Sequence, residues 1–159
     1  MKILAYSLAA VLVLTGAARA QEADPTGPQP KLPTESLTII GDDGKSHVFT
    51  VELPVTQEQQ DTGEMFRTSI PADSGMLFMW PQPETQAMWM KNCPVPEDMV
   101  FIGADGTIKS IAEMTVPYSL TPVGPSVPVI ATLELQGGIT AALGISVGDK
   151  VVAKQFGGS

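Results

Sequence analysis

The side chains best suited to chemistry fall within one short stretch, residues 87–102, which reads AMWMKNCPVPEDMVFI. Its polar members are Lys91, Asn92, the single cysteine Cys93, Glu97 and Asp98. An ammonium group, an amide and carboxylates offer both donors and acceptors, which suits a small polar ligand, a sugar or a peptide end. We expect a ligand pocket at this point of the fold, lined by Arg67, Lys91, Asn92, Asp98 and Glu134.

The same polar groups can also satisfy one another. Buried polar side chains usually find partners within the protein, so Asp98 would accept hydrogen bonds from Asn92 and from loop amides. Arg67 would then pair with Glu134 as a structural tie. On this interpretation the cluster stabilises the fold and binds nothing, and both interpretations stay open.

A soft-metal site is an alternative function. Seven of the eight methionines follow Met1, and Cys93 and His47 add sulfur and imidazole, which are ligands that favour Cu(I). Methionine in apolar runs also fills irregular gaps in a core, and the ligand spacing of dedicated metal sites is absent. We therefore predict no metal site and no cofactor, with copper binding through Met, Cys and His as the alternative.

An enzyme is a further alternative. Cys93 as a nucleophile would need a base within hydrogen-bond reach, and the only histidine, His47, is expected on a different hairpin. A hydrolase using Asp98 with Glu134 as an acid–base pair is conceivable, but paired acids are common in an acidic chain. We predict binding rather than catalysis and assign no catalytic residue.

The N-terminus has the pattern of an export signal. Lys2 precedes an apolar run over 3–14, and Ala18-Arg19-Ala20 forms a small-residue cleavage site, so residues 1–20 are expected to be a signal peptide. The run is too short for a comfortable membrane span of about 20 residues, so no stable membrane insertion is expected after cleavage. Residues 21–35 contain four prolines and are expected to be a flexible leader. The expected location is periplasmic or secreted.

The charge argues against nucleic acid as a partner. The chain carries 9 basic and 17 acidic residues, a formal charge of −8. Loss of Lys2 and Arg19 with the signal would leave 7 against 17, or −10. Non-specific binding to nucleic acid depends on clustered Lys and Arg. We expect a small polar ligand or an envelope protein as the partner instead.

Residues 36–156 are expected to form a single β domain. Asp43-Gly44 between alternating runs predicts a hairpin of 36–41 with 46–53, and Thr56 to Gln59 has the form of a capping box that begins a short helix. Further strands are expected at 75–80, 107–114, 127–135 and 150–155, with a short helix at 140–143 and a long loop at 116–126. The pocket stretch itself is expected to fold as the central hairpin, with 88–92 paired to 98–102. About seven strands with one or two short helices indicate a mainly β fold, an antiparallel β-sandwich or an open barrel.

Several of these segments, taken in order, resemble the family called domain of unknown function 192. They span roughly 51–151 and include GEMFR at 63–67, GMLF at 75–78, MWMKN at 88–92, VPED at 95–98 and LEL at 133–135. The resemblance implies a compact, mainly β domain, often behind an export signal, without an established activity. The residues that match the family's polar pattern are Arg67, Lys91, Asn92, Asp98 and Glu134. Cys93 and Glu97 depart from the pattern, because the family usually has threonine and an aliphatic residue there.

Overall fold

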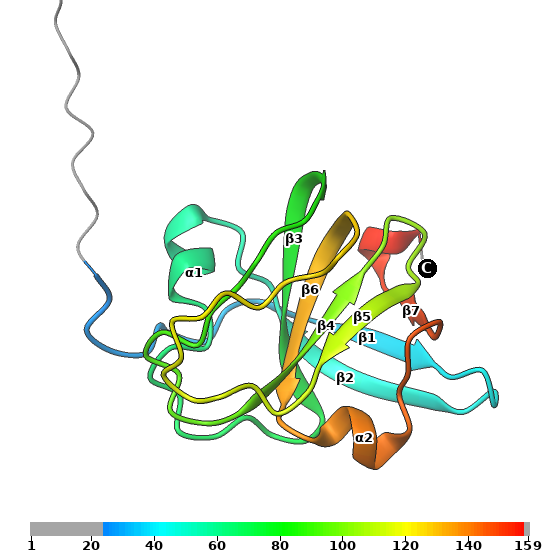
Figure 1. Cartoon of the computed structure of the whole chain (residues 1–159), viewed down its shortest axis with the longest axis horizontal. Coiled ribbons are helices and arrows are strands. Elements are labelled where there is room, and N and C mark those ends of the chain that lie inside the picture. The colour runs from blue at the N-terminus through cyan, green and yellow to red at the C-terminus, as the bar shows by residue number, and fades with distance from the viewer. Residues whose placement is uncertain (1–23, 158–159) are drawn as a thin grey trace, which may run out of the picture.

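The computed structural model describes residues 24–157. Seven strands form one curled sheet, a half-barrel, in the order β5-β4-β6-β3-β2-β1-β7 (Figure 1). The strands are β1 (Thr34–Ile40), β2 (Ser46–Glu52), β3 (Ser74–Glu84), β4 (Glu97–Ile102), β5 (Ile108–Ala112), β6 (Val129–Gln136) and β7 (Lys150–Val152). The helices are α1 (Gln57–Thr62) and α2 (Ile139–Leu143), and a 3₁₀ turn, Lys154–Phe156, follows β7. The predicted mainly β fold with short helices is confirmed.

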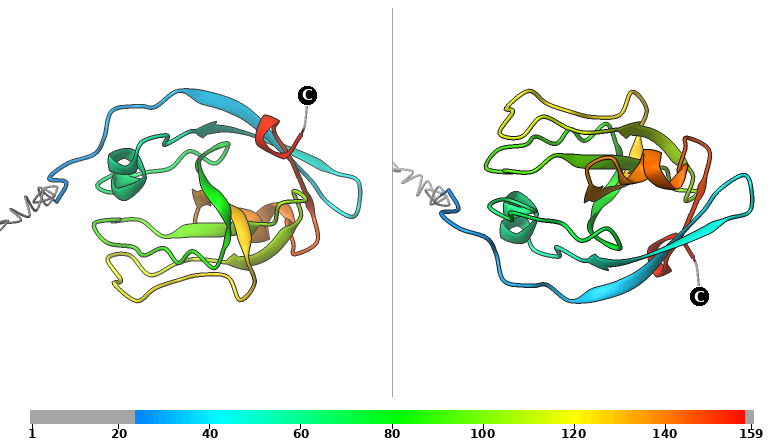
Figure 2. Two further views of the ribbon diagram at one scale, coloured as in Figure 1. Left: turned by 90° about the horizontal axis from the view of Figure 1, so that it is seen from above. Right: turned by 90° about the horizontal axis from the view of Figure 1, so that it is seen from below.

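The sheet curls far enough for its two edge strands to meet. An isolated bridge joins Thr107, just before β5, to Lys150 of β7, and the Ile108 amide donates to the Asp149 carbonyl at 3.0 Å. Viewed from above and below, β1 and β2 lie on one side of the interior, with β4 and β5 on the other (Figure 2). Of the two predicted architectures, the structure is therefore the open barrel rather than two stacked sheets.

Neighbouring strands are antiparallel with one exception, the parallel pair β2–β3. The chain between these two strands contains α1, and a parallel pair requires such a crossover. The β1–β2 hairpin forms as predicted, with Gly44 in the left-handed conformation (φ 78°) that a tight turn requires. The capping box of α1 also forms, because Thr56 accepts from the Gln59 amide and the Gln59 side chain accepts from the Thr56 amide.

The predicted central hairpin is wrong. β4 lies between β5 and β6, so both of its hydrogen-bonding edges are occupied and the segment before it pairs with neither. Asn92 takes a left-handed conformation (φ 58°) and Pro94 and Pro96 lack amide donors, so the chain turns away where a hairpin would have to close. Met88 instead forms an isolated bridge with Val123 in the long loop. The prediction that this strand is buried on both faces is correct, since all six residues of β4 are buried.

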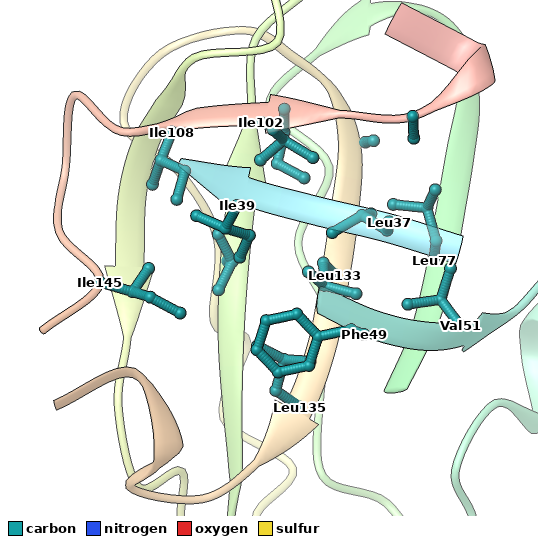
Figure 3. Packing of buried hydrophobic residues seen from close by; sticks show 14 residues of the cluster. Leu37, Ile39, Phe49, Val51, Leu77, Ile102, Ile108, Leu133, Leu135 and Ile145 are labelled. Carbon is teal, nitrogen blue, oxygen red and sulfur yellow. The ribbon is translucent and has the colours of Figure 1, made fainter. Parts of the chain in front are cut away.

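The main core fills the inside of the curled sheet. Alternate residues of the strands point inward and pack on one another (Figure 3), namely Leu37, Ile39, Phe49, Val51, Leu77, Val100, Ile102, Leu133 and Leu135. Each is at most 1% exposed. Since strand side chains alternate, the residues between them face the outside of the half-barrel. That outer face of β3, β6 and β4 is covered by loops, and it carries the candidate site.

The described part of the leader lies against the domain. The Leu53 amide donates to the Pro33 carbonyl at 3.0 Å, and the Gln29 side chain donates to the carbonyls of Gln59 and Gly63. These contacts fix residues 29–33 beside α1 and the end of β2. The expected signal peptide, residues 1–20, lies outside the described residues. Between residues 24 and 157, no helix has the length and apolar character that a membrane crossing requires.

Candidate functional site

A row of alternating glutamate and methionine crosses the outer face of the sheet. Glu52 of β2 pairs with Met76 of β3, Met76 with Glu134 of β6, and Glu134 with Met99 of β4. Glu97, two residues before Met99, points to the same face. All five side chains are buried. The sheet therefore places three carboxyl groups under a protein cover, where solvent cannot hydrate them.

Two loop segments form that cover. Gly63 ends α1 with a positive φ of 49°, and the chain continues over the sheet through Glu64, Met65 and Phe66. The Phe66 amide donates to the Asn92 carbonyl at 2.8 Å, which joins this segment to the one before β4. Both residues are left-handed (φ 64° and 58°), a conformation that is unfavourable for phenylalanine. The junction therefore holds Glu64 above the row of glutamates at a cost in backbone strain.

Arg67 neutralises only part of the buried acid. Its two terminal nitrogens donate to the Glu52 carboxylate at 2.8 and 2.9 Å. Burial acts to raise the pKa of Glu52, but the Arg67 hydrogen bonds and that from the Leu32 amide outweigh it, so the pKa lies below its ordinary value. Arg67 Nε lies 3.1 Å from Glu64 Oε2, an ion pair without hydrogen-bond geometry. Burial raises the pKa of Glu64 more than the charge of Arg67 lowers it, and the pKa is about 7.

Glu97 and Glu134 have no such partner among the described residues. Neither oxygen of Glu97 has a hydrogen-bond donor. Burial, followed by the charge of Glu64, raises the pKa of Glu97 to about 8. Burial, followed by Glu97 and Glu64, raises the pKa of Glu134 well above its ordinary value. Carboxyl groups that are buried near one another favour the protonated, neutral form.

Cys93 lies beside these acids as a protonated thiol. It is 5% exposed, and its Sγ is 3.5 Å from the Lys91 carbonyl, to which it donates. Burial first, and then the charges of Glu97 and Glu134, raise the pKa of the Cys93 thiol. A thiolate is the nucleophilic and metal-binding form, so this setting suppresses both reactivities.

A cavity of about 500 Å³ opens between α1, the outer face of β3 and the segment before β4. Phe78 and Trp80 stack in its wall, with ring centroids 6.1 Å apart and an angle of 22° between the rings. The polar residues of the lining include Glu64, Cys93 and Glu134 together with Asp24, Gln60, Asp61, Gln86 and Lys91, and Met65 and Met88 are among its apolar residues. The indole nitrogen of Trp80 is buried without an acceptor. The cavity thus combines aromatic walls with unpartnered polar atoms, as small-molecule sites do.

The rim of this cavity joins the leader to the cover. Lys91 Nζ lies 2.8 Å from an oxygen of Asp24 and 5.3 Å from the centroid of the Trp89 ring. Lys91 therefore forms a cation–π pair with Trp89 and an ion pair with Asp24. Trp89 is 48% exposed, so one face of the ring remains open at the mouth.

The structure separates the five predicted site residues. Glu134 and Lys91 line the cavity, and Arg67 lies under it, paired with Glu52 and Glu64 rather than with Glu134. The Asn92 side chain donates to the Met65 sulfur and its backbone binds Phe66, so its role is in the cover.

Asp98 lies away from this cavity. It alternates with Glu97 along β4 and shares the inner face with Val100 and Ile102, so it does not share a site with Glu134. Its carboxylate accepts from the amides of Met114, Gly138 and Thr140 and from the Thr140 hydroxyl. It caps the first turn of α2, whose own N-cap residue is Gly138. The acid–base pair considered for Asp98 and Glu134 does not exist in this fold.

Sequence reasoning missed Glu52, Glu64 and Glu97 as members of the site. A signal was present, because Glu52 ends an alternating strand and Glu97 opens an apolar one, each at a position that a sheet face would bury. His47 lines a separate shallow hollow with Phe49, Ile139 and Leu143, so it cannot serve Cys93 as a base. Among residues 24–157, no three His, Cys, Asp or Glu side chains are placed to hold a metal ion.

Fold and site together define a curled, mainly β domain with a partly covered outer face and a cavity lined by acids. The sequence model of DUF192, described as "Uncharacterized ACR", matches residues 38–153. The chain belongs to this family.

Two solved structures resemble it closely. One, from Sinorhizobium meliloti 1021, is described as a candidate transcription regulator; it is 38% identical with a TM-score of 0.77, over 80% of this chain and 98% of that one. The other, a protein of unknown function from Novosphingobium aromaticivorans DSM 12444, is 38% identical with a TM-score of 0.74, over 86% and 94%. Among curated proteins, no sequence matches this chain.

Proposed function

We propose that this domain is a non-catalytic binding protein that takes a small polar organic ligand into the cavity beside α1. The observation that carries the proposal is the Glu134 carboxyl group. It is 3% exposed, lines a cavity with aromatic walls, and receives no hydrogen bond from the described residues. A buried polar group without a partner costs stability, and a ligand that supplies the partner removes that cost.

The other candidate functions find less support in the same geometry. Copper binding would need free sulfur ligands, but the sulfurs of Met65 and Met90 accept hydrogen bonds from Asn92 and Thr115, and Cys93 is held as the thiol. Hydrolysis through Cys93 would need a thiolate, and burial with the neighbouring acids raises the pKa of this thiol and keeps it protonated. Binding of an organic ligand in this cavity requires neither free sulfur ligands nor a reactive thiol.

The Sinorhizobium protein is described as a candidate transcription regulator, but the basic residues of this chain argue against DNA binding here. Four of the seven basic side chains after residue 20 form ion pairs with acids: Lys45, Arg67, Lys91 and Lys109. A DNA-binding face needs free Lys and Arg to displace counterions from phosphates. With the export pattern of residues 1–20, we place the domain in the periplasm or outside the cell, where its ligand would be a solute or part of an envelope component.

Intrinsic fluorescence provides a direct test, because both tryptophans of the chain, Trp80 and Trp89, line the cavity. The protein would be screened with panels of small amines, carboxylic acids, alcohols and sugars, with tryptophan emission and melting temperature as readouts. We expect at least one class to change the emission and raise the melting temperature.

Two variants separate binding in the cavity from binding elsewhere. Ala87→Phe fills the mouth from an exposed position that lines the cavity, and it should abolish both responses. Ala104→Phe, in an exposed turn outside the cavity lining, should retain them. No response from any class, or an equal response from Ala87→Phe, would overturn the proposal.

A further inference from the structure

The polar surface of the cavity has an excess of acid. Glu52, Glu64, Glu97 and Glu134 lie buried around a single buried base, Arg67, and Glu52 takes both of its terminal nitrogens. Placing ionisable groups in a dry interior is costly unless each one is paired. Two of the incompletely neutralised acids, Glu64 and Glu134, reach the cavity lining, where a partner of opposite charge can meet them.

The cavity offers little to an anion. Lys91, the only basic residue in its lining, lies at the rim and is already paired with Asp24 and stacked near Trp89. Two buried polar atoms of this lining have no hydrogen-bond partner: Glu64 Oε2, an acceptor, and the Trp80 indole nitrogen, a donor. A ligand carboxylate or phosphate would find no unpaired basic group in this lining.

An organic cation fits both parts of the lining. An ammonium group supplies donors to carboxylates, and its charge is also attracted to aromatic faces such as those of Trp80 and Phe78. The apolar body of the molecule would then lie against Met65 and Met88. A volume of about 500 Å³ is within the range of small-molecule sites, about 300–1,000 Å³.

On the basis of the binding function proposed above, we infer that the ligand is a small organic amine whose ammonium group donates hydrogen bonds to Glu64 and Glu134. Its charge replaces the protons that these carboxyl groups hold in the empty cavity, so binding releases protons to solvent. The charged and titratable groups in or beside the cavity lining are Asp24, Glu52, Asp61, Glu64, Arg67, Lys91, Cys93, Glu97 and Glu134.

Three probes of one shape test the charge of the ligand: 2-phenylethylamine, 2-phenylethanol and 3-phenylpropionate. Tryptophan fluorescence at pH 7.5 should show the amine binding at least about tenfold more tightly than the alcohol, because hydrogen bonds to charged groups are the stronger ones. The carboxylate should bind least. Calorimetry in two buffers of different ionisation enthalpy should show release of up to about one proton per amine bound. The affinity for the amine should rise from pH 6 to pH 8.

Glu134→Gln preserves shape and removes the charge, and it should reduce both the preference for the amine and the proton release. Glu64→Gln repeats the test if Glu134→Gln does not fold. Glu58→Gln, on the exposed first turn of α1 outside the cavity, should behave as the wild type.

The outcomes distinguish this inference from the function on which it rests. Equal binding of amine and alcohol, tightest binding of the carboxylate, or amine binding without proton release would overturn the amine assignment and leave the cavity as a binding site. Binding of only acids or sugars from the wider panel would do the same. No binding of any compound would overturn both.

Discussion

Glu134 and Asp98 show how the surroundings of a carboxyl group decide its role. Both are acids in apolar strands. Asp98 accepts hydrogen bonds from three amides and a hydroxyl and caps a helix. Glu134 instead lies near other acids and lines the cavity. Cys93 and Glu97 lie close enough beside the cavity for each to shift the pKa of the other.

The thiol of Cys93 should resist modification in the folded protein. It is 5% exposed and its pKa is raised by burial and by Glu97 and Glu134, so little thiolate forms at pH 8. We expect the thiol reagent DTNB to label it at least about 100-fold more slowly in buffer than in denaturant, since exposure and thiolate fraction both fall.

A matched control moves the thiol to the surface. Cys93→Ser combined with Ser126→Cys places it on an exposed loop residue, which should react quickly. Native Cys93 reacting as fast as this control would show that it is accessible and ionised.

At the level of elements, the close contact of β3 with β6 aligns the site. Gly75 lies opposite Leu135, and Met76 opposite Glu134. A Cβ at Gly75 would overlap the Glu134 carbonyl oxygen and lie 2.8 Å from Leu135 Cδ2. Glycine lets the two backbones approach at the residue next to the buried carboxyl group. The same pairing sets the row from Glu52 to Met99.

Gly75→Ala should therefore destabilise the fold. A backbone atom cannot move aside as a flexible side chain can, so we expect the free energy of unfolding in urea to fall by about 1–3 kcal/mol or more. Gly27→Ala, with no atom within 4 Å of the added Cβ, should change it by less than about 0.5 kcal/mol. Equal stability of the two variants would mean that the β3–β6 contact has room to adjust.

At the scale of the whole molecule, the curled sheet buries two faces with different chemistry. The inner face holds a continuous aliphatic and aromatic core. The outer face of β3, β6 and β4 holds a second cluster rich in sulfur, with Met65, Met90, Cys93 and Met99, and with the glutamates beside it. The inner core supplies stability by excluding water from apolar surface, while the outer cluster contains groups whose protonation differs from that in the unfolded chain.

This difference predicts that the protein is more stable in weak acid than at neutral pH. The pKa values of Glu64 (about 7) and Glu97 (about 8), and that of Glu134, are raised above 4.5, so the folded state binds more protons than the unfolded chain between these values. Stability should fall as pH rises from about 5 to 8. The pKa of Glu52 is lowered, so its contribution is present above 4.5 and is lost below it. We therefore expect maximum stability near pH 5.

Urea midpoints at pH 5, 6, 7 and 8 measure this slope. Glu97→Gln, which cannot ionise, should flatten it and be more stable than the wild type at pH 8, while Glu58→Gln should keep the wild-type slope. A midpoint that stays level or rises from pH 5 to 8 would contradict the prediction.

Local chemistry in the sequence determined much of the fold. Asp43-Gly44 between alternating runs specified the first hairpin, and the Thr56 and Gln59 pair specified the start of α1, because each signal acts over a few residues. The mainly β class followed from the number of such runs. Of the five residues predicted to line a pocket, Lys91 and Glu134 line the cavity.

Only the tertiary structure decided which strands pair and which acids meet. The turn at Asn92 and the two prolines prevent the preceding segment from forming a hydrogen-bonded ladder with β4. β6, about 30 residues later, pairs with β4 instead. Once β6 is in place, strand alternation sends Glu134 and Glu97 to one face and Asp98 to the other. Glu52 joins them through the pairing of β2 with β3, and the hydrogen bond between Phe66 and Asn92 holds the segment of Glu64 over the sheet; no short sequence window contains these contacts. Long-range strand order is a property of how the whole chain buries its apolar surface, so the buried acids of this site became visible only in the folded molecule.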